Sequence, residues 1–343
     1  MDKTNLETVP EATLRQVTGH IFEAAGCDPE TARLTTDMLI EAELRGHSTH
    51  GMLRVPTMVQ RIESQRIDPR AKPEVVLERA ATALVDAQRA LGPVGVTYGA
   101  NLAVEKAKRS GSCTVGVVNA DHIGLAGYYA DQIARAGCVG ILCGVTMPLV
   151  HPLGGLDRIL GTNPMAIAVP TNGADPILLD FATSAIAMGT VLEAQITGDP
   201  IPEGGAIGPD GRPTTDANAV RQGALSPFGG HKGYGLCLMI GLMAGPLLGA
   251  KVGQPLGEAV RAGYYDKGEL IIAIDPEAFG DPAIFRTAVE SHVAELRGTT
   301  PIAASAPVRV PGERSFAERQ RRLQDGIPVD SQVWSQLVAL AGS

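Results

Sequence analysis

The sequence predicts an α+β fold, with helices at both ends of the chain and a strand-rich middle. Apolar residues recur at helical spacing before residue 65 and again after residue 312, whereas short β-branched runs dominate residues 83–180. The chain has 343 residues, of which 44% are hydrophobic and 19% charged, as in large globular proteins with a buried core. We expect the two helical ends to pack together.

The first 70 residues or so are predicted to be helical. Apolar residues share one face of a helix over residues 8–25. A second helix begins at Asp28 and ends before Gly46, and a third covers residues 54–64.

Strands and helices then alternate, separated by turns rich in Gly, Asn and Asp. Residues 195–230 are rich in Gly and Pro and have little periodicity, which predicts either a functional loop or a partly disordered segment. Strands are predicted at 83–86, 113–118, 139–145, 165–169, 177–180 and 270–274, and helices at 94–110, 125–136, 184–194, 232–250 (buried), 282–297, 312–324 and 330–340.

Composition excludes several classes of protein. The net charge is −8 and no Lys/Arg patch is interleaved with aromatic residues, so a nucleic-acid partner is not expected. The longest apolar run, residues 236–250, is too short to span a membrane. Residues 1–7 contain no apolar signal core, which predicts a cytoplasmic protein. The five scattered cysteines are expected to be reduced core residues; they are Cys27, Cys113, Cys138, Cys143 and Cys237.

The stretch Arg45-Gly-His-Ser-Thr-His-Gly51, followed by Arg54, is the densest group of side chains able to move protons or hold a carboxylate. His50 has two hydroxyl neighbours that can orient its ring, and Gly51 permits a sharp turn. Arg54 is near enough to hold a carboxylate in a bidentate fork while His50 faces the adjacent carbon. The alternative interpretation is a histidine that caps the end of a helix.

Further polar turns lie beside strands or open helices. Asn119–Gly124 contains His122 and lies between a strand and a helix, where anions can bind; a structural pairing of His122 with Asp121 is the alternative. Gly161–Pro164 and Asp180–Ser184 adjoin strands. Gly229–Gly235 opens a helix with glycines and a lysine, which favours a diphosphate. Each of these patterns alone is also typical of a structural turn.

Several common motifs are absent. The chain has no G-x-G-x-x-G after a strand, no Walker A motif, no H-E-x-x-H and no G-x-S-x-G. No metal is expected, because His47 and His50 have no acidic third ligand nearby.

In this order and at these distances, the motifs resemble those of the malate/L-lactate dehydrogenase type 2 family, from near residue 11 to Arg322–Pro328. The resemblance implies an oxidoreductase that uses NAD or NADP and has a non-Rossmann fold. It implies a helical domain of residues 1–75 and 300–343 and a central α/β NAD(P)-binding domain of residues 76–299 with a mixed sheet. It also implies a homodimer with the cofactor near the interface.

The resemblance assigns roles to individual residues. Thr49 and His50 match a Ser/His pair, His122 matches the histidine of the second motif, and these three are expected to be catalytic. Arg54, Thr162, Met188 and Gly189 are expected to contact the substrate. The cofactor is expected to contact His122, Ile123, Gly124, Leu125, Ala126, Asp180, Phe181, Ala182, His231 and Lys232.

The expected reaction is hydride transfer between NAD(P)H and C2 of a 2-oxo acid or 2-hydroxy acid, with His50 or His122 exchanging the proton. We favour His50 because Arg54 lies beside it. Met58 replaces a common tyrosine, so we expect a more apolar substrate side chain. Thr190 stands where imine-reducing members carry aspartate, which counts against the alternative of a cyclic imine-2-carboxylate reductase. A non-catalytic binding protein is the remaining alternative, and both histidines and the arginine argue against it.

Overall fold

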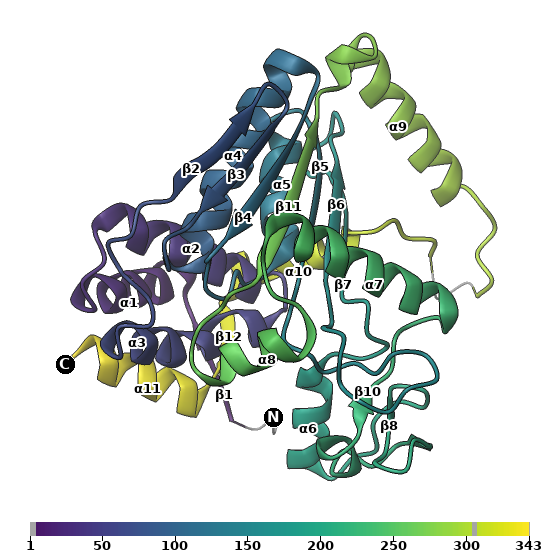
Figure 1. Cartoon of the computed structure of the whole chain (residues 1–343). Helices are drawn as coiled ribbons and strands as arrows, with labels where there is room; N and C mark the ends of the chain where they lie inside the picture. Colours follow the sequence, from purple (N-terminus) through teal and green to yellow (C-terminus); the bar gives the residue numbers. More distant parts are fainter. Residues whose placement is uncertain (1–4, 304–306, 343) are drawn as a thin grey trace.

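A computed structural model describes residues 5–303 and 307–342 and confirms the predicted α+β fold (Figure 1). Its central sheet is built from β2 (Glu74–Arg79), β3 (Thr82–Asp86), β4 (Ser112–Val118), β5 (Val139–Gly144), β6 (Met165–Val169), β7 (Ile177–Phe181) and β11 (Gly268–Ile274). These seven strands lie in the order β2-β3-β4-β11-β5-β6-β7. The sheet is mixed, because β3 and β4 are parallel whereas β11 inserts antiparallel between β4 and β5.

Helices cover both faces of this sheet. α4 (Gly92–Ser110) packs against β4 and β11, and α5 (Ala126–Arg135) packs against β5 and β6. α7 (His231–Ala244) lies on the opposite face, against β5 and β11 (Figure 1). Alternate residues of β11 therefore enter two different cores, which explains its nearly continuous apolar sequence.

The two ends of the chain meet, as predicted. β1 (Leu6–Val9) pairs antiparallel with β12 (Ile327–Asp330), and α1 (Glu11–Ala24) packs against α11 (Ser331–Ala341). The same helical unit contains α2 (Pro29–Leu44), α3 (Val55–Glu63) and α10 (Glu313–Asp325).

The helical unit and the central sheet share one hydrophobic core, which includes Phe22 of α1, Met38 of α2 and Ile271 of β11. The predicted division into a helical domain and a central domain therefore stays a prediction, because the shared core marks no boundary. Residues 1–4, 304–306 and 343 of the predicted helical domain lie outside the described residues.

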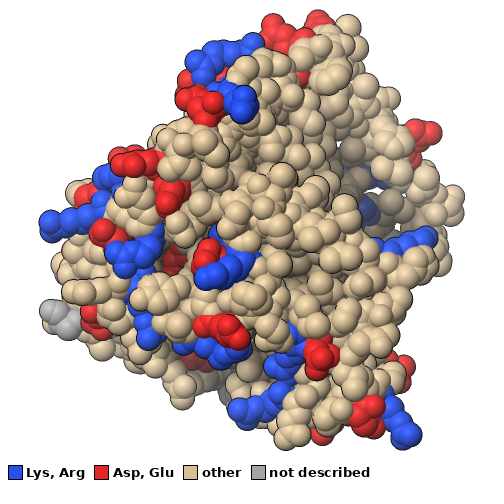
Figure 2. Space-filling model, viewed as in Figure 1, with Lys and Arg blue, Asp and Glu red and all other residues tan. Residues whose placement is uncertain are grey.

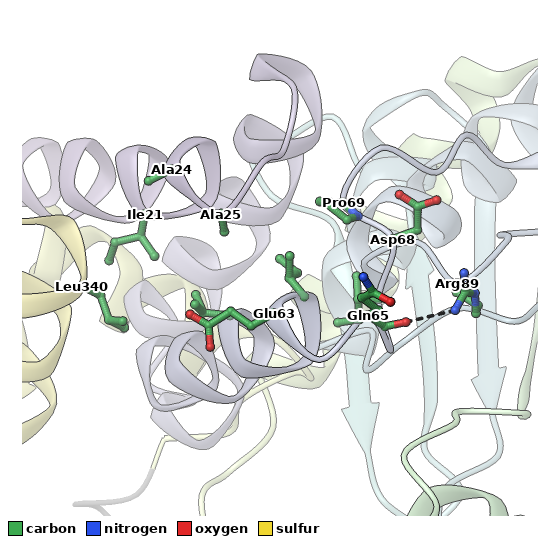
Figure 3. Close-up of a pocket in the computed structure, with 12 residues that line it drawn as sticks. Ile21, Ala24, Ala25, Glu63, Gln65, Asp68, Pro69, Arg89 and Leu340 are labelled. Carbon is green, nitrogen blue, oxygen red and sulfur yellow. Dashed lines mark hydrogen bonds between the residues drawn. The ribbon is translucent and has the colours of Figure 1, made fainter. Parts of the chain in front are cut away.

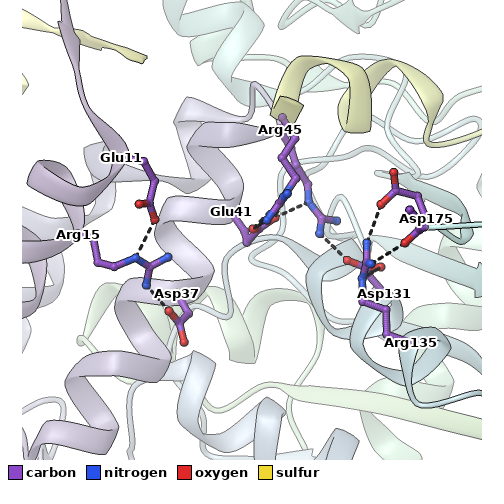
Figure 4. Close-up of polar contacts among 10 residues, drawn as sticks. Glu11, Arg15, Asp37, Glu41, Arg45, Asp131, Arg135 and Asp175 are labelled. Atoms are coloured by element: carbon purple, nitrogen blue, oxygen red, sulfur yellow. Dashed lines mark hydrogen bonds and ion pairs between the residues drawn. The ribbon is translucent and has the colours of Figure 1, made fainter. Parts of the chain in front are cut away.

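Buried ion pairs also connect the two parts (Figure 4). Arg45 directly follows α2. It contacts Glu41 of that helix (Nε–Oε2, 3.0 Å) and Asp131 of α5 (Nη2–Oδ2, 2.5 Å). Asp131 also pairs with Arg135, and Arg319 of α10 pairs with Glu41. Removing one partner of a buried pair typically costs ~3–5 kcal/mol. This network therefore fixes the end of α2 against α5.

Residues 195–230 are not disordered, which corrects one of the two predictions for this segment. They contain β8 (Ala206–Ile207), β9 (Pro213–Thr214) and β10 (Ala224–Leu225), which form a small antiparallel sheet. A separate hydrophobic cluster, with Val150 and Val220 among its members, holds this unit together.

Two predicted helices have different ends in the structure. α6 (Met188–Thr197) begins four residues late, because the backbone N–H of Ala185 instead donates to the carbonyl of Ser226. α7 ends before Gly245 rather than at residue 250. The predicted burial holds for one face, which includes Cys237 and Ile240, but not for the other, where Met239 and Leu242 are 53% and 44% exposed.

The sequence patterns did not identify β2 or α8 (Gly253–Arg261). All five cysteines are free and buried, as predicted. Within the described residues, no single helix has the length and apolar composition to cross a membrane. One bent pair of helices, His231–Leu248 and Gly253–Arg261, meets these two criteria when the helices are taken together, by length and composition only.

Candidate active site

His50 lies in two short 3-10 turns that follow α2, spanning Ser48–His50 and Met52–Arg54. Between the turns, Gly51 has no room for a side chain, since a Cβ there would lie 2.4 Å from Oε1 of Glu43. The same oxygen accepts a hydrogen bond from the backbone N–H of Met52 at 2.8 Å. The buried carboxyl group of Glu43 thus shapes the turn that presents His50.

His50 and Arg54 are joined through Thr49. Nδ1 of His50 lies 3.0 Å from the Thr49 hydroxyl, and Nε of Arg54 donates to the Thr49 carbonyl at 2.6 Å. Among the described residues, nothing forms a hydrogen bond or ion pair with the two Nη groups of Arg54. Burial, followed by the charges of Arg54 and His47, lowers the pKa of His50 to about 4.

His122 lies in the loop between β4 and α5. Oδ1 of Asp121 accepts hydrogen bonds from the His122 backbone N–H and from Nη1 of Arg61, the latter at 2.7 Å. The backbone N–H of Gly124 donates to Nδ1 of His122 at 3.1 Å. An accepting Nδ1 places the ring proton of a neutral histidine on Nε2.

The two histidine rings face each other, with centroids 5.7 Å apart and planes inclined by 32°. Burial, and then the positive charge of Arg54, lowers the pKa of His122 well below its ordinary value. The structure therefore brings four predicted residues into one polar centre: Thr49, His50 and Arg54 from the helical unit and His122 from the sheet. His47, in contrast, has no part in this ring contact.

Thr162, Met188 and Gly189 were also predicted to contact the substrate. The backbone N–H of Thr162 donates to the Thr146 hydroxyl at 2.8 Å, and the two hydroxyls are 3.1 Å apart. At the start of α6, a Cβ on Gly189 would lie 2.9 Å from the methyl group of Thr49. The first turn of α6, which includes Met188, thus packs against the turn that carries His50.

The predicted cofactor residues at the end of β7 lie beside the His122 loop. Oδ2 of Asp180 accepts a hydrogen bond from the backbone N–H of Gly127, in the first turn of α5, at 2.7 Å. Burial raises the pKa of Asp180 to about 6. Phe181 packs edge-on against Phe228, with ring centroids 5.6 Å apart. The end of β7 therefore lies against the first turn of α5, directly after residues 122–126.

The N-terminus of α7 fits the diphosphate of a dinucleotide. Gly229 and Gly230 have φ angles of 58° and 63°, and a Cβ at either position would meet nothing within 4 Å. His231 and Lys232 follow and are exposed, and no described side chain caps the helix. Open backbone N–H groups next to a lysine at a helix N-terminus suit a phosphate anion.

Neither of two hollows in the structure is lined by His50 or His122. One, of about 910 Å³, is bordered by Asp121 and Tyr265. The other, of about 690 Å³, lies between α1, α3 and Leu340, and contains none of the predicted site residues (Figure 3). Ile21 and Ala25 of α1 and Leu340 face this second groove (Figure 3).

Sequence reasoning missed several polar residues of the centre. Arg61 bridges Asp121 and the Tyr265 hydroxyl, and Thr146 holds Thr162. Lys267 also acts on the pKa of His122. One signal was available, because Lys267-Gly-Glu269 places two charges immediately before a strongly apolar strand.

Comparisons with known proteins agree with this arrangement. Residues 9–338 match the family model described as malate/L-lactate dehydrogenase. The malate/(S)-sulfolactate dehydrogenase of Methanothermus fervidus is 38% identical, over 94% of this chain and 93% of that protein. Hydroxycarboxylate dehydrogenase B of Escherichia coli K12 is 34% identical, over 95% of this chain and 91% of that protein.

Solved structures give the same result. The sulfolactate dehydrogenase of Methanocaldococcus jannaschii superposes with a TM-score of 0.92 at 35% identity, covering 98% of this chain and 97% of that chain. The Δ1-piperideine-2-carboxylate reductase of Pseudomonas syringae superposes with a TM-score of 0.87 at 30% identity, covering 97% and 99%.

Proposed function

Since the chain belongs to the malate/L-lactate dehydrogenase family and is a 2-hydroxy-acid dehydrogenase with a nicotinamide cofactor, we propose that Arg54 binds the substrate carboxylate and His50 exchanges the proton. The Nε–H of Arg54 is held by the Thr49 carbonyl, which leaves both Nη groups for a bidentate fork. A carboxylate in this fork brings C2 of the substrate close to His50. The bound nicotinamide supplies or accepts the hydride.

Hydrogen bonding favours His50 over His122 for proton exchange, and this contrast is the observation that carries the proposal. Nδ1 of His50 faces a hydroxyl, which can donate or accept, so the ring keeps its partner in either protonation state. Nδ1 of His122 faces the N–H of Gly124, which can only donate. Protonation of that nitrogen would set two N–H groups against each other. His122 therefore stays neutral, and its Nε2–H serves as a fixed donor to the substrate oxygen.

In reduction, C2 receives a hydride and the oxygen receives the proton of His50, which gives the 2-hydroxy acid; oxidation reverses both transfers. Arg54 disfavours the protonated form of His50 in the free enzyme. A bound carboxylate offsets that positive charge, so substrate binding raises the proton affinity of His50.

The remaining residues divide between substrate and cofactor. Thr162, Met188 and Gly189 contact the substrate. Residues 122–126 and 180–182 hold the nicotinamide half, and His231 and Lys232 hold the diphosphate. NAD and NADP are both candidates, because no ribose contact distinguishes them.

The experiment that tests this function is a panel of 2-oxo acids and Δ1-piperideine-2-carboxylate, each with NADH and with NADPH. We expect turnover of at least one 2-oxo acid. Turnover of the cyclic imine alone would replace the proposed substrate class. Failure of both NADH and NADPH to bind in a fluorescence titration would contradict the cofactor assignment.

A homodimer is part of the proposal, and two exposed apolar faces support it. On α7, Met239 and Leu242 are exposed, and few charged atoms lie over this helix (Figure 2). α9 (Pro282–Arg297) stands away from the sheet (Figure 1), and its Ile284 is 71% exposed. Sedimentation velocity of Leu242→Glu should show monomers where the parent protein sediments as a dimer, and equal sedimentation of both would contradict this interface.

We also propose a cytoplasmic location. Five buried thiols without a disulfide suit a reducing compartment. Fractionation of the native host, with an immunoblot of each fraction, tests this location.

A further inference from the structure

A buried charged pair lies at the start of the central strand β11, where the charge of Lys267 acts on His122. Gly268 pairs with Val118 of β4, and its carbonyl accepts a hydrogen bond from the N–H of Val145 after β5. The preceding residue, Lys267, therefore lies between the His122 loop, which follows β4, and Thr146, which holds Thr162. Ligands of α/β sheets bind at this edge, beyond the carboxyl ends of the parallel strands.

Lys267 is bound to Glu269, two residues along the same strand. Nζ of Lys267 contacts Oε1 of Glu269, and the two side chains are 6% and 0% exposed. The second carboxyl oxygen of Glu269 has no hydrogen-bond partner among the described residues. Burial lowers the pKa of Lys267 to about 7. Below this pKa the pair has no net charge, whether its proton lies on Lys267 or on Glu269.

The charges around His122 leave one cation without compensation. Three cations act on this ring: Arg54, Lys267 and Arg61. Arg61 pairs with Asp121 at 2.7 Å, and Lys267 pairs with Glu269. Of these three, Arg54 is the one with no carboxylate partner among the described residues. With Lys267 protonated and both histidines neutral, these three cations and the carboxylates of Asp121 and Glu269 sum to about one positive unit, which matches one substrate carboxylate.

The start of α6 packs against the turn that carries His50 and forms a wall of the site without charged side chains. Residues 184–192 contain no Asp, Glu, Lys or Arg, and Gly189 lies against the methyl group of Thr49. A second anionic group on the substrate would thus lose water without gaining a cationic partner from this wall. Burying an unpaired charge is strongly unfavourable.

We propose that the substrate is a 2-oxo or 2-hydroxy acid with a single anionic group and an uncharged side chain, and that Glu269 enforces this selectivity by neutralising Lys267. The proposal rests on the proposed function, since it takes Arg54 as the carboxylate site. It differs from what the names of the sulfolactate and malate dehydrogenases say of those relatives, whose substrates carry two acidic groups.

The test compares kcat/KM for 2-oxobutyrate, which has an uncharged side chain, and for oxaloacetate, which has a second carboxylate. Assays at pH 6 keep Lys267 protonated in the parent enzyme, and a series from about pH 5 to 7 covers the lower pKa that this lysine takes once its carboxylate partner is removed. The parent enzyme should prefer 2-oxobutyrate, and Glu269→Gln should shift the ratio toward oxaloacetate by about tenfold because Lys267 becomes an unpaired cation. Asp266→Asn is the matched control, because it removes a carboxylate of the same segment that pairs with the exposed Lys251.

A preference of the parent enzyme for oxaloacetate would overturn the proposal, as would equal ratios for Glu269→Gln and Asp266→Asn at every pH of the series. The double variant Lys267→Met/Glu269→Gln removes both charges without exposing a cation, so it should keep the parent ratio. It also controls for misfolding of the single variant, with thermal unfolding as the check.

A binding assay separates failure of the proposal from failure of the proposed function. Quenching of bound-NADH fluorescence by oxamate, a single anion, and by tartronate, a double anion, reports charge selectivity without turnover. Tighter binding of oxamate supports the proposal even if no 2-oxo acid is reduced, and tighter binding of tartronate overturns it.

Discussion

The two histidines of the site come from different parts of the molecule and have opposite hydrogen-bond environments. His50 lies on a turn of the helical unit, and its Nδ1 faces a hydroxyl that can reverse its role. His122 lies on a loop of the central sheet, and its Nδ1 faces a backbone N–H that cannot. The rings are 5.7 Å apart. The comparison teaches that proximity to substrate is not sufficient for proton exchange; the partner of the second ring nitrogen decides which histidine can change its charge.

The largest expected effect comes from removing the histidine that changes charge. His50→Ala should lower kcat by about two to four orders of magnitude, because the substrate oxygen loses its proton donor. NADH affinity, measured by fluorescence titration, should be nearly unchanged. Turnover close to that of the parent enzyme would show that His50 is not the proton donor.

The pH dependence tests the same contrast without a substitution. The pKa of His50 is lowered to about 4 in the free enzyme, and reduction needs its protonated form. For reduction, kcat/KM should therefore fall by about tenfold per pH unit as pH rises above the pKa. For oxidation, which needs the neutral form, kcat/KM should rise through this pKa and then level off. A flat reduction profile between about pH 6 and 8 would contradict the assignment.

Arg54→Lys should raise KM by about 10- to 100-fold with a smaller change in kcat, because a single ammonium cannot replace a bidentate fork. Steady-state kinetics with the preferred 2-oxo acid measures this effect. Arg33→Lys is a suitable control, since Arg33 forms an exposed pair with Asp37 on α2. Equal KM values in the two variants would remove Arg54 from the substrate site.

His122→Gln sharpens the comparison, because an amide N–H can replace a fixed Nε2–H donor but cannot exchange a proton. We expect kcat to fall by only about tenfold, the cost of one imperfect hydrogen bond. His122→Leu, which removes the donor, should be worse. If His122→Gln were as inactive as His50→Ala, the proton would pass through His122 instead.

The smallest effect is expected at Thr49. Thr49→Val keeps the shape but removes the hydroxyl that faces His50, and kcat should fall by roughly three- to tenfold. Thr49→Ser restores the hydroxyl and should behave like the parent enzyme in the same assay. An equal loss in both variants would mean that packing against Gly189, rather than the hydroxyl, matters at this position.

Local sequence patterns predicted most of the elements. The helices of the first 64 residues and the strands β3 to β7 follow directly from periodicity and turn residues, because each is fixed by neighbours in the chain. The pairing of β1 with β12 joins residues more than 300 positions apart and leaves no local signal. The insertion of β11 between β4 and β5 is equally non-local.

In the candidate site, too, only contacts between residues close in sequence could be predicted from local patterns. His50 and Arg54 are close in sequence, so their cooperation could be predicted from spacing alone. His122 joined them only through the family resemblance. Lys267 could not be placed at all, because its position depends on the order of strands in the sheet. For residues 195–230, the alternative of partial disorder failed for another reason: many of the glycines and prolines there form the turns of a small ordered sheet.

The pairing of β1 with β12 also determines when the helical unit can be completed during translation. Residues 6–9 leave the ribosome more than 300 residues before their partner strand, residues 327–330. α10 and α11, which pack against α2 and α1, are equally late. The nascent chain therefore keeps the helical segment that bears His50 without these partners until residues 313–341 have been made, with its apolar faces available to chaperones. The turn that carries His50 therefore belongs to a unit that is completed only when residues 327–341 are available.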